Sequence, residues 1–359
     1  MSKELLTVKD LKIGFTVRGK ELTAIRGVDL ELYEHEILAI VGESGSGKSV
    51  LTKSFTGMLD KNGRIISGTI DYDGHRLSDL KTNKEWLKYR GREFSTIFQD
   101  PMTSLNPVRT IGSQISEVII KHQGKSKKEA RTMAIDIMDK VGIPNAADRY
   151  EEYPFEYSGG MRQRIVIAIA LACRPRVLIC DEPTTALDVT IQAQILRLLK
   201  SLQKEFGFTI IFITHDLGVV AEIADRVAVM YAGQIVEKGT VEDIYYDPRH
   251  PYTWALLSSL TQLSESKEDM YFIPGAPPSL YTTIKGDAFA PRSRYAMKID
   301  FEKEPPVYSV SDTHTAKTWL LDPQAPEVEK PDIIKDLHEK ILAHTRYDFA
   351  QQQGGETNE

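Results

Sequence analysis

Residues 42–49 read Gly-Glu-Ser-Gly-Ser-Gly-Lys-Ser, which fits the pattern G-x-x-x-x-G-K-[ST] of a phosphate-binding loop. The apolar run 37–41 before the loop predicts a buried strand, and 48–59 after it predicts a helix. In that order, backbone N–H groups of the loop and the N-terminus of the helix converge on anionic oxygen atoms. Glycines keep Cβ atoms out of the way. The loop therefore predicts a nucleotide-binding α/β domain.

Two side chains of this loop have expected roles of their own. Lys48 reaches the β- and γ-phosphates, and the hydroxyl of Ser49 ligates Mg²⁺. The rest of the predicted nucleotide contacts in this stretch come from Gly42, Ser44, Gly45, Ser46, Gly47 and Val50.

Composition narrows the class of protein. The chain has 359 residues, enough for two or three domains, and its net charge of −6 gives no general reason to expect nucleic-acid binding. The longest apolar run, Ile165 to Cys173, is far shorter than the ~20 residues of a membrane-spanning helix. No signal peptide is visible, and Cys173 and Cys180 lie in apolar surroundings, against a disulfide scaffold. We expect a cytoplasmic protein that meets a membrane only through a partner.

The pattern along the chain changes twice. Residues 5–41 alternate apolar and polar, which predicts short antiparallel strands with turns at Gly19 and Gly27, and 68–74 predicts another strand. A capping box at 126–129 opens a helix that runs to Val141 and stops at Gly142. The apolar runs 177–180 and 209–213 predict buried parallel strands joined by a crossover helix over 190–205. The fold class is therefore α/β, with a helical insertion at about 100–172.

Beyond about residue 252 proline becomes frequent and periodicity weakens. We expect a domain boundary near 255, a loop-rich extension over 256–330, and a tail over 331–359 that is disordered around 351–355. The phosphate loop is not repeated, so residues 1–255 form a single nucleotide domain.

A carboxylate pair, Asp181 and Glu182, ends the first of the two predicted parallel strands. Ligands bind at the carboxyl ends of strands in such sheets, so Asp181 suits Mg²⁺ and Glu182 suits polarisation of an attacking water. The alternative is a carboxylate pair at a helix start, since Pro183 and Thr184 follow. The phosphate loop upstream favours catalysis.

Three further motifs give weaker signals of function when each is taken on its own. His215 follows the second parallel strand, where it could contact the γ-phosphate, although a lone histidine is more often structural. Gln99 follows the run 96–98 and could ligate Mg²⁺ or orient water. Ser158-Gly159-Gly160 precedes a predicted helix and makes a second anion site, which one nucleotide rarely needs.

Together these motifs resemble the ATP-binding subunit of an ABC transporter. The phosphate loop, the Q-loop glutamine Gln99, the signature 158–163, the pair Asp181-Glu182, a D-loop at 186–188 and the switch histidine His215 occur in the family's order. The resemblance implies that two such domains pair head to tail. Each ATP then lies between one subunit's loop and the other's Ser158, Gly159, Gly160 and Asp188. It also places Phe15 where an aromatic ring stacks on adenine, although a core phenylalanine is an equal alternative.

Further segments resemble the oligopeptide/dipeptide importer branch of the family. They are 98–107, 160–164 and 250–253, together with 289–292 and 304–306 in the extension, and Met161 and Ile169 resemble the branch's D-type ATPase. The resemblance implies ATP and Mg²⁺ as ligands and hydrolysis that drives oligopeptide import from the cytoplasmic face of a bacterial plasma membrane. Gln99, Lys48, Glu182 and His215 are the expected catalytic residues.

The implied partners are a homologous F-type ATPase subunit, two transmembrane permease subunits and an extracellular peptide-binding protein, with no nucleic acid. Three alternatives remain open. The cargo could be dipeptides, nickel chelates or another small solute. The chain could be a soluble ABC-type ATPase acting on DNA or the ribosome, or a regulatory module that binds nucleotide without turning it over.

The extension departs from its relatives at four positions. Many of them carry four cysteines that hold an iron–sulfur cluster, and here the matching positions are Asp287, Ser293, Asp300 and Thr318. Cluster ligands are thiolates. We therefore expect no iron–sulfur cluster.

Overall fold

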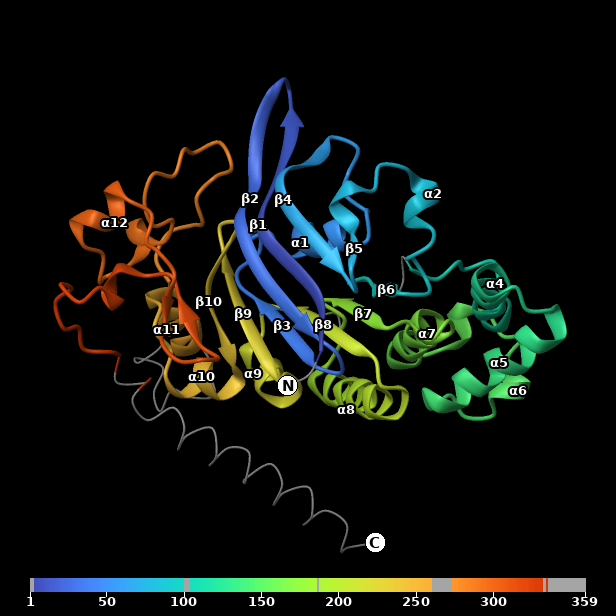
Figure 1. The fold of residues 1–359 in the computed structure, drawn as a ribbon. Helices are drawn as coiled ribbons and strands as arrows, with labels where there is room; N and C mark the ends of the chain where they lie inside the picture. Colours follow the sequence, from blue (N-terminus) through green and yellow to red (C-terminus); the bar gives the residue numbers. More distant parts are fainter. Residues whose placement is uncertain (1–2, 100–103, 186, 260–272, 332–333, 335–359) are drawn as a thin grey trace, which may run out of the picture.

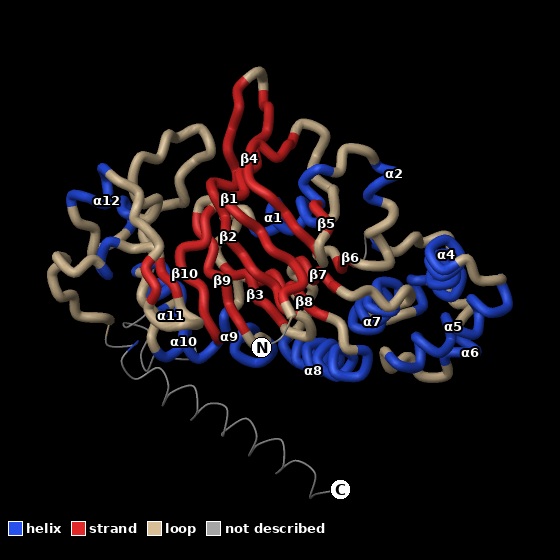
Figure 2. The backbone as a smooth tube through the Cα atoms, in the orientation of Figure 1, coloured by secondary structure: helices blue, strands red, loops and turns tan. Residues whose placement is uncertain are grey.

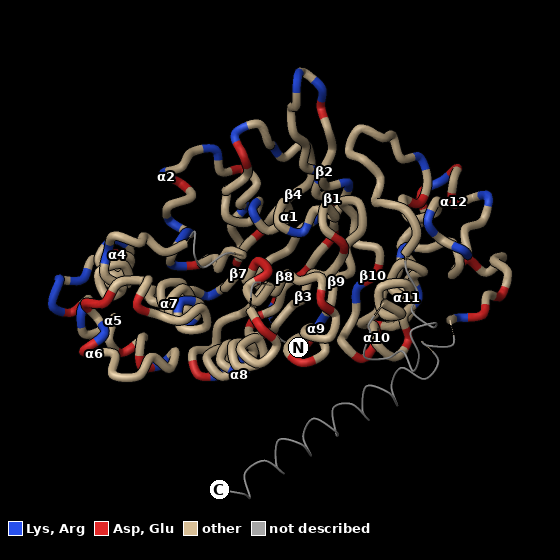
Figure 3. Tube along the Cα trace, turned by 180° about the vertical axis from the view of Figure 1, so that it is seen from behind, with Lys and Arg blue, Asp and Glu red and all other residues tan. Residues whose placement is uncertain are grey.

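A computed structural model describes all of the chain except residues 1–2, 100–103, 186, 260–272, 332–333 and 335–359. Two β-sheets occupy the middle of the molecule, a lobe of helices lies at one end and the loop-rich extension at the other (Figures 1 and 2). Lysines and arginines are interspersed with aspartates and glutamates along the backbone (Figure 3). Within the described ranges, no helix is both long enough and apolar enough to cross a membrane.

The larger sheet has eight strands in the order β11-β12-β10-β9-β3-β8-β7-β6. Pairing is parallel from β6 through β7, β8 and β3 to β9, and antiparallel from β9 to β11. The strands are β3 (Ile37–Val41), β6 (Phe94–Ile97), β7 (Val177–Asp181), β8 (Thr209–Thr214), β9 (Arg226–Tyr231), β10 (Gln234–Thr240), β11 (Tyr308–Ser309) and β12 (Thr315–Ala316). The predicted strands 37–41, 177–180 and 209–213 are confirmed.

The smaller sheet is antiparallel, in the order β2-β1-β4-β5. Its strands are β1 (Glu4–Val17), β2 (Lys20–Tyr33), β4 (Gly63–Tyr72) and β5 (His75–Arg76). The prediction of short strands is wrong here, because β1 and β2 are each 14 residues long. The turn at Gly19 is confirmed, but Gly27 lies inside β2, where its φ of 85° and a shift in register mark a β-bulge. A bulge and a turn share one sequence signal, a glycine that can adopt a positive φ.

The helices gather mainly below and beside the larger sheet (Figure 2). They are α1 (Lys48–Phe55), α2 (Asn83–Trp86), α4 (Ile111–Gln123), α5 (Lys127–Lys140), α6 (Ala146–Arg149), α7 (Gly159–Leu171), α8 (Val189–Phe206), α9 (Leu217–Ile223), α10 (Val241–Tyr246), α11 (Pro251–Ser258) and α12 (Lys298–Glu302). The capping box at Ser126 and Glu129 is present, and the crossover helix is α8. Helix α1 ends at Phe55, short of the predicted residue 59, because Gly57 follows in a left-handed conformation.

The parallel strands are buried on both faces, which explains their unbroken apolar sequence. In β7, Leu178 and Cys180 pack into the core formed with α4–α8, whereas Val177 and Ile179 pack into the core formed with α1 and the antiparallel sheet. This double coverage fixes the strands rigidly, so the residues at their carboxyl ends are held in place.

The extension joins the nucleotide domain through the larger sheet. Strands β9 and β10, which are not among the predicted elements, form a hairpin across Ala232 and Gly233, both with positive φ. Strand β12 then pairs with β10. Helix α11 crosses the predicted boundary near 255, and the division at that point stays a prediction. The predicted disorder at 351–355 lies outside the described residues.

Candidate nucleotide-binding site

The predicted site residues follow four neighbouring parallel strands. Gln99 comes after β6, Asp181 ends β7, His215 comes after β8, and the phosphate loop comes after β3. Because these strands are parallel and adjacent, their carboxyl ends lie along one edge of the sheet. Residues that are more than 160 positions apart in the chain are thus brought to one place.

The shape of the loop depends on two of its glycines. Gly42 has φ 149°, and a Cβ there would lie 2.1 Å from the carbonyl oxygen of Met230. Gly47 has φ 105°, and a Cβ there would meet the side chain of Ile25 at 2.9 Å. Any other residue would have to displace the loop from β9 and β2. The hydroxyl of Ser46 is buried and has no hydrogen-bond partner in the described structure, as suits a loop built to receive an anion.

Lys48 bends back over the loop that precedes it. Its Nζ donates to the carbonyl oxygens of Gly42 at 2.7 Å and Glu43 at 3.0 Å. The side chain is buried, and this burial lowers the pKa of the ammonium group, partly offset by the charges of Glu182 and Asp181. A cation held here, beside the N-terminus of α1, supplies a fixed positive charge for phosphate oxygens.

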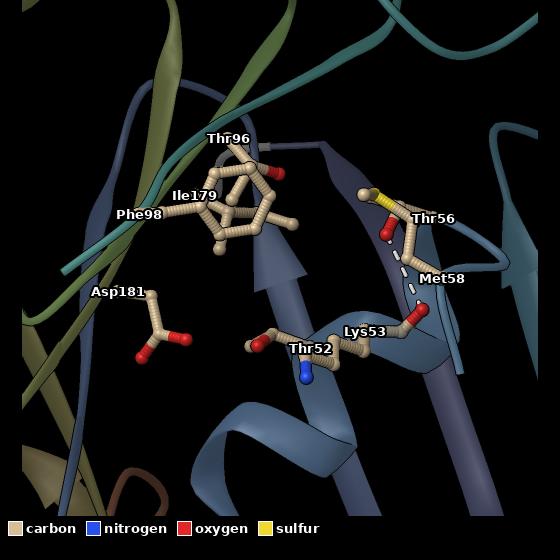
Figure 4. A pocket seen from close by; sticks show the side chains of 8 residues that line it. All are labelled: Thr52, Lys53, Thr56, Met58, Thr96, Phe98, Ile179 and Asp181. Carbon is tan, nitrogen blue, oxygen red and sulfur yellow. Dashed lines mark hydrogen bonds between the residues drawn. The ribbon is translucent and has the colours of Figure 1, made fainter. Parts of the chain in front are cut away.

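Ser49 and Asp181 are in direct contact. The hydroxyl of Ser49 donates to Asp181 Oδ1 at 3.0 Å, and burial raises the pKa of this carboxyl group. Figure 4 shows Asp181 facing α1 across a small pocket whose walls include Phe98 and Ile179. Hydroxyl and carboxylate oxygens are the hard donors that Mg²⁺ prefers, so this pair fits the metal that accompanies a nucleotide.

Glu182 is where three other side chains meet. Gln99 Nε2 donates to Glu182 Oε2 at 3.1 Å, the Thr185 hydroxyl donates to the same oxygen at 3.2 Å, and His215 Nδ1 lies 3.4 Å from Oε1. Glu182 itself has φ 49°, a left-handed conformation that is uncommon for residues other than glycine. Thr185 was missed by the sequence reasoning, although its place three residues after Glu182 is a signal for such a contact.

The signature residues lie elsewhere in the subunit. Figure 1 places α7 beside the lobe of α4–α6, apart from α1. The side chain of Ser158 caps α7 by accepting from Met161 N at 3.3 Å, and that of Asp188 caps α8 by accepting from Ile191 N at 3.0 Å. Gly160 sits against α8, where a Cβ would come within 2.8 Å of Ile191. Gly159 is exposed, and a Cβ there would meet no atom within 4 Å.

Phe15 lies on β1 and packs over the backbone of β4. A Cβ on Gly63 would come within 2.6 Å of its ring, which is only partly buried. The adenine-stacking role of Phe15 stays a prediction.

The chain has clear relatives. Residues 25–185 match the family model of the ABC transporter, and residues 236–299 match that of the oligopeptide/dipeptide transporter C-terminal region. The oligopeptide transport ATP-binding protein AmiE of Streptococcus pneumoniae is 70% identical over 95% of this chain and 97% of its own length. This chain belongs to the ABC transporter ATP-binding subunits of the oligopeptide/dipeptide branch.

Other relatives of this ABC subunit agree. The oligopeptide transport ATP-binding protein OppD of Bacillus subtilis is 57% identical over 94% of each chain. Among solved structures, the ATP-binding cassette MJ0796, a dimer in a post-hydrolysis state with ADP and phosphate, has a TM-score of 0.58 at 26% identity, covering 66% of this chain and 98% of the other. CbiO1 of Clostridium perfringens has a TM-score of 0.60 at 28% identity, covering 68% and 91%.

Membership of this family fixes the general activity. The ABC subunit binds ATP, with Mg²⁺ as the accompanying metal, and hydrolyses it. As the cassette of an ABC importer it works with transmembrane permease subunits and a substrate-binding protein. The α/β fold predicted from the motifs is confirmed.

Proposed function

We propose that this ABC subunit hydrolyses ATP to energise the import of oligopeptides across a bacterial plasma membrane, as a peripheral subunit at its cytoplasmic face. The proposal is supported by the 70% identity with an oligopeptide transport protein along almost the whole chain. The observation within the structure that supports catalysis is the convergence of Gln99, Thr185 and His215 on Glu182, beside the phosphate loop.

Each residue has a task in this reaction. The N–H groups of 42–50 and the ammonium of Lys48 would hold the phosphates. Ser49, Asp181 and Gln99 would hold Mg²⁺, which would supply positive charge to the phosphates. Glu182 orients and polarises the attacking water. His215 stabilises charge that develops on the γ-phosphate. Phe15 contributes stacking to the adenine.

The second half of each ATP site comes from another cassette. We assign this role to Ser158, Gly159, Gly160 and Asp188, which lie at the starts of α7 and α8. Helix α7 lies apart from the subunit's own α1 (Figure 1). The partner is a homologous F-type ATPase, since this chain carries the D-type residues Met161 and Ile169. A Glu182→Gln subunit mixed with the F-type protein and MgATP should elute as a heterodimer. Elution as separate subunits, or as a homodimer alone, would refute the pairing.

No iron–sulfur cluster is part of this proposal. Asp287, Ser293, Asp300 and Thr318 offer only oxygen ligands, and each side chain already accepts a hydrogen bond from a nearby backbone N–H, of Phe289, Tyr295, Met297 and Leu320 respectively. Anaerobically purified protein should therefore contain far less than one iron–sulfur cluster per chain. Stoichiometric iron and sulfide would overturn this expectation.

The cargo is tested in the assembled complex. The purified ATPase pair, the permeases and the peptide-binding protein are reconstituted in lipid, and ATP turnover is measured with a hexapeptide, a dipeptide, a nickel chelate or no addition. Stimulation by the hexapeptide that exceeds the other two supports the oligopeptide assignment. If only the dipeptide or only the nickel chelate stimulates ATP turnover, that compound represents the class of cargo. A complex containing Lys48→Ala gives the background rate of ATP turnover, because this variant should bind ATP poorly.

A further inference from the structure

The C-terminal extension contacts the phosphate loop directly. Arg292 Nη1 donates to Glu43 Oε2 at 2.6 Å, and Nη2 donates to Oε1 at 3.0 Å, so the pair is bidentate. Glu43 is the second residue of the loop, whereas Arg292 lies 249 positions later, in the extension. Bidentate arginine–carboxylate pairs fix geometry as well as supply energy.

Arg292 is held in place by contacts with both the extension and β9. Its side chain is only 6% exposed. It also donates to the carbonyl oxygen of Pro274 at 2.7 Å and to the hydroxyl of Tyr231 at 3.1 Å, and it lies against the Phe289 ring. A guanidinium fastened this way cannot follow a moving carboxylate, so its position constrains that of Glu43.

A second contact reaches the same loop residue. The backbone N–H of Glu43 donates to the hydroxyl of Tyr252 at 2.8 Å, from the first turn of α11. The rings of Tyr252, Tyr231 and Phe289 pack together, with centroids 4.5 to 5.3 Å apart. Both groups that hold Glu43 therefore belong to one packed cluster: the hydroxyl is that of Tyr252, and the guanidinium of Arg292 lies against the rings of Tyr231 and Phe289.

Glu43 transmits this restraint to the centre of the loop. Its carbonyl oxygen accepts from Ser46 N at 3.2 Å and from Lys48 Nζ at 3.0 Å. All the polar groups of Glu43 are therefore engaged: the carboxylate with Arg292 of the extension, the N–H with Tyr252 of α11, and the carbonyl with Ser46 and Lys48 of the loop. A shift of Glu43 must move Ser46 or Lys48.

We propose that Arg292 and Tyr252 are positioning residues for ATP: through Glu43, the extension holds the phosphate loop in its nucleotide-binding shape. The inference rests on the proposed role of 42–50 in binding ATP. In this proposal the extension acts in the ATPase cycle itself, because a partner that displaced Arg292 would lower the affinity for ATP.

The test measures ATP affinity and urea unfolding in the full chain. Arg292→Met keeps the volume of the side chain against the aromatic rings, and Glu43→Ala removes its partner. Each should weaken MgATP binding by about fivefold to tenfold, the usual range for a charged hydrogen-bonded pair, and the double variant should be no weaker than the worse single one. In the assembled ATPase, the KM for ATP should rise while kcat stays within about twofold.

Two variants separate positioning from stability. Arg249→Ala removes an arginine that pairs with Asp247 beside α11 and serves as the matched control, with unchanged affinity. Arg292→Lys should bind ATP more tightly than Arg292→Met, because lysine restores the positive charge although it cannot donate two parallel hydrogen bonds to the carboxylate. If Arg292→Met does not fold, Tyr252→Phe, which removes a single hydroxyl, carries the test and should also weaken binding.

The outcomes are distinguishable. Wild-type affinity in folded Arg292→Met and Tyr252→Phe, with Lys48→Ala impaired, would reject the inference and leave the proposed function intact. Wild-type affinity in Lys48→Ala would instead reject the assignment of the loop. Strictly additive losses in the double variant would show that Arg292 does not act through Glu43.

Discussion

Gln163 of α7 donates its side-chain amide to the carbonyl oxygen of Pro183, 2.7 Å away. Gln163 is completely buried, and Pro183 directly follows Glu182. Helix α7 begins at the Ser158 cap, where the second cassette is expected to contact the subunit. One buried hydrogen bond thus links the helix that we propose contacts the partner's nucleotide to the segment that carries the proposed catalytic carboxylate.

Gln163→Met should uncouple these two segments. The methionine keeps the volume but leaves the Pro183 carbonyl without its donor, so the orientation of Glu182 is less well defined. We expect kcat of the assembled ATPase to fall about tenfold with little change in ATP affinity, as is usual for a coupling position. Gln203→Met is the control, because Gln203 is also buried and makes a bond of 2.6 Å to the His35 carbonyl away from the site. Equal loss of activity in both variants would mean that only stability was affected.

Glu182→Gln should bind ATP as the parent does and lose nearly all hydrolysis. The amide keeps the size of the side chain but cannot polarise water, a contribution of about a hundredfold or more in rate. Phosphate release and ATP binding are measured on the same assembled complex. Thr185→Val, which removes only the hydroxyl that donates to Glu182, should have a much smaller effect. Undiminished turnover in Glu182→Gln would reject the assigned role.

Phe15→Leu distinguishes the two alternatives for this ring. If the ring stacks on adenine, ATP affinity should fall about tenfold, a typical value for the loss of one aromatic–base contact. Phe15→Tyr keeps the ring and should bind ATP normally. If the ring only covers Gly63, both leucine and tyrosine variants will bind ATP equally well, and only the urea midpoint of the leucine variant will fall.

Asp287→Asn should stabilise the protein in a pH-dependent way. Burial raises the pKa of Asp287 from 3.8 to about 6, with smaller opposing contributions from a hydrogen bond with Phe289 N and from Arg26. The protonated Asp287 carboxyl therefore makes its full contribution to stability below about pH 4, and this contribution is lost as the pH rises through about 6. The asparagine variant should match the parent near pH 4 and exceed it at pH 8 by on the order of 1–3 kcal/mol in the free energy of unfolding.

His250 and Asp73 provide the checks on that experiment. His250 Nε2 lies 3.9 Å from Asp287 Oδ2, and burial lowers the pKa of the imidazole to about 4, so it is neutral over most of the range. Asp73 is the opposite case: hydrogen bonds from Arg176 and Lys3 lower its pKa to about 2. Asp73→Asn should destabilise the protein at pH 7, and this effect should diminish as the pH falls through about 2. A gain at pH 8 that persists unchanged at pH 4 would contradict the assignment to Asp287.

The fold was predictable where the sequence signal is local. The phosphate loop, the capping box at Ser126 and the apolar strand from Val177 depend on neighbours a few residues away, and each is present. Gly27 was ambiguous because a bulge and a turn both need a positive φ. The hairpin of β9 and β10 could have been found from Ala232-Gly233, a two-residue turn between apolar strands.

The site was only partly predictable. Gln99, Glu182 and His215 could be named because each follows a predicted strand, and strand ends share an edge of the sheet. The contact between Arg292 and Glu43 has no local signal, since 249 residues separate them and neither residue type is unusual in its segment. Such contacts depend on tertiary packing, which a single sequence does not encode in any short pattern.

The short strands of the extension also decide how this molecule can associate. β12 occupies the free backbone groups of β10 with two residue pairs, and β11, two residues long, becomes the edge of the sheet. An edge this short offers almost nothing for a foreign strand to pair with. At this end of the larger sheet the chain's own backbone takes the place of a foreign strand, so a partner that approaches here is recognised by side chains.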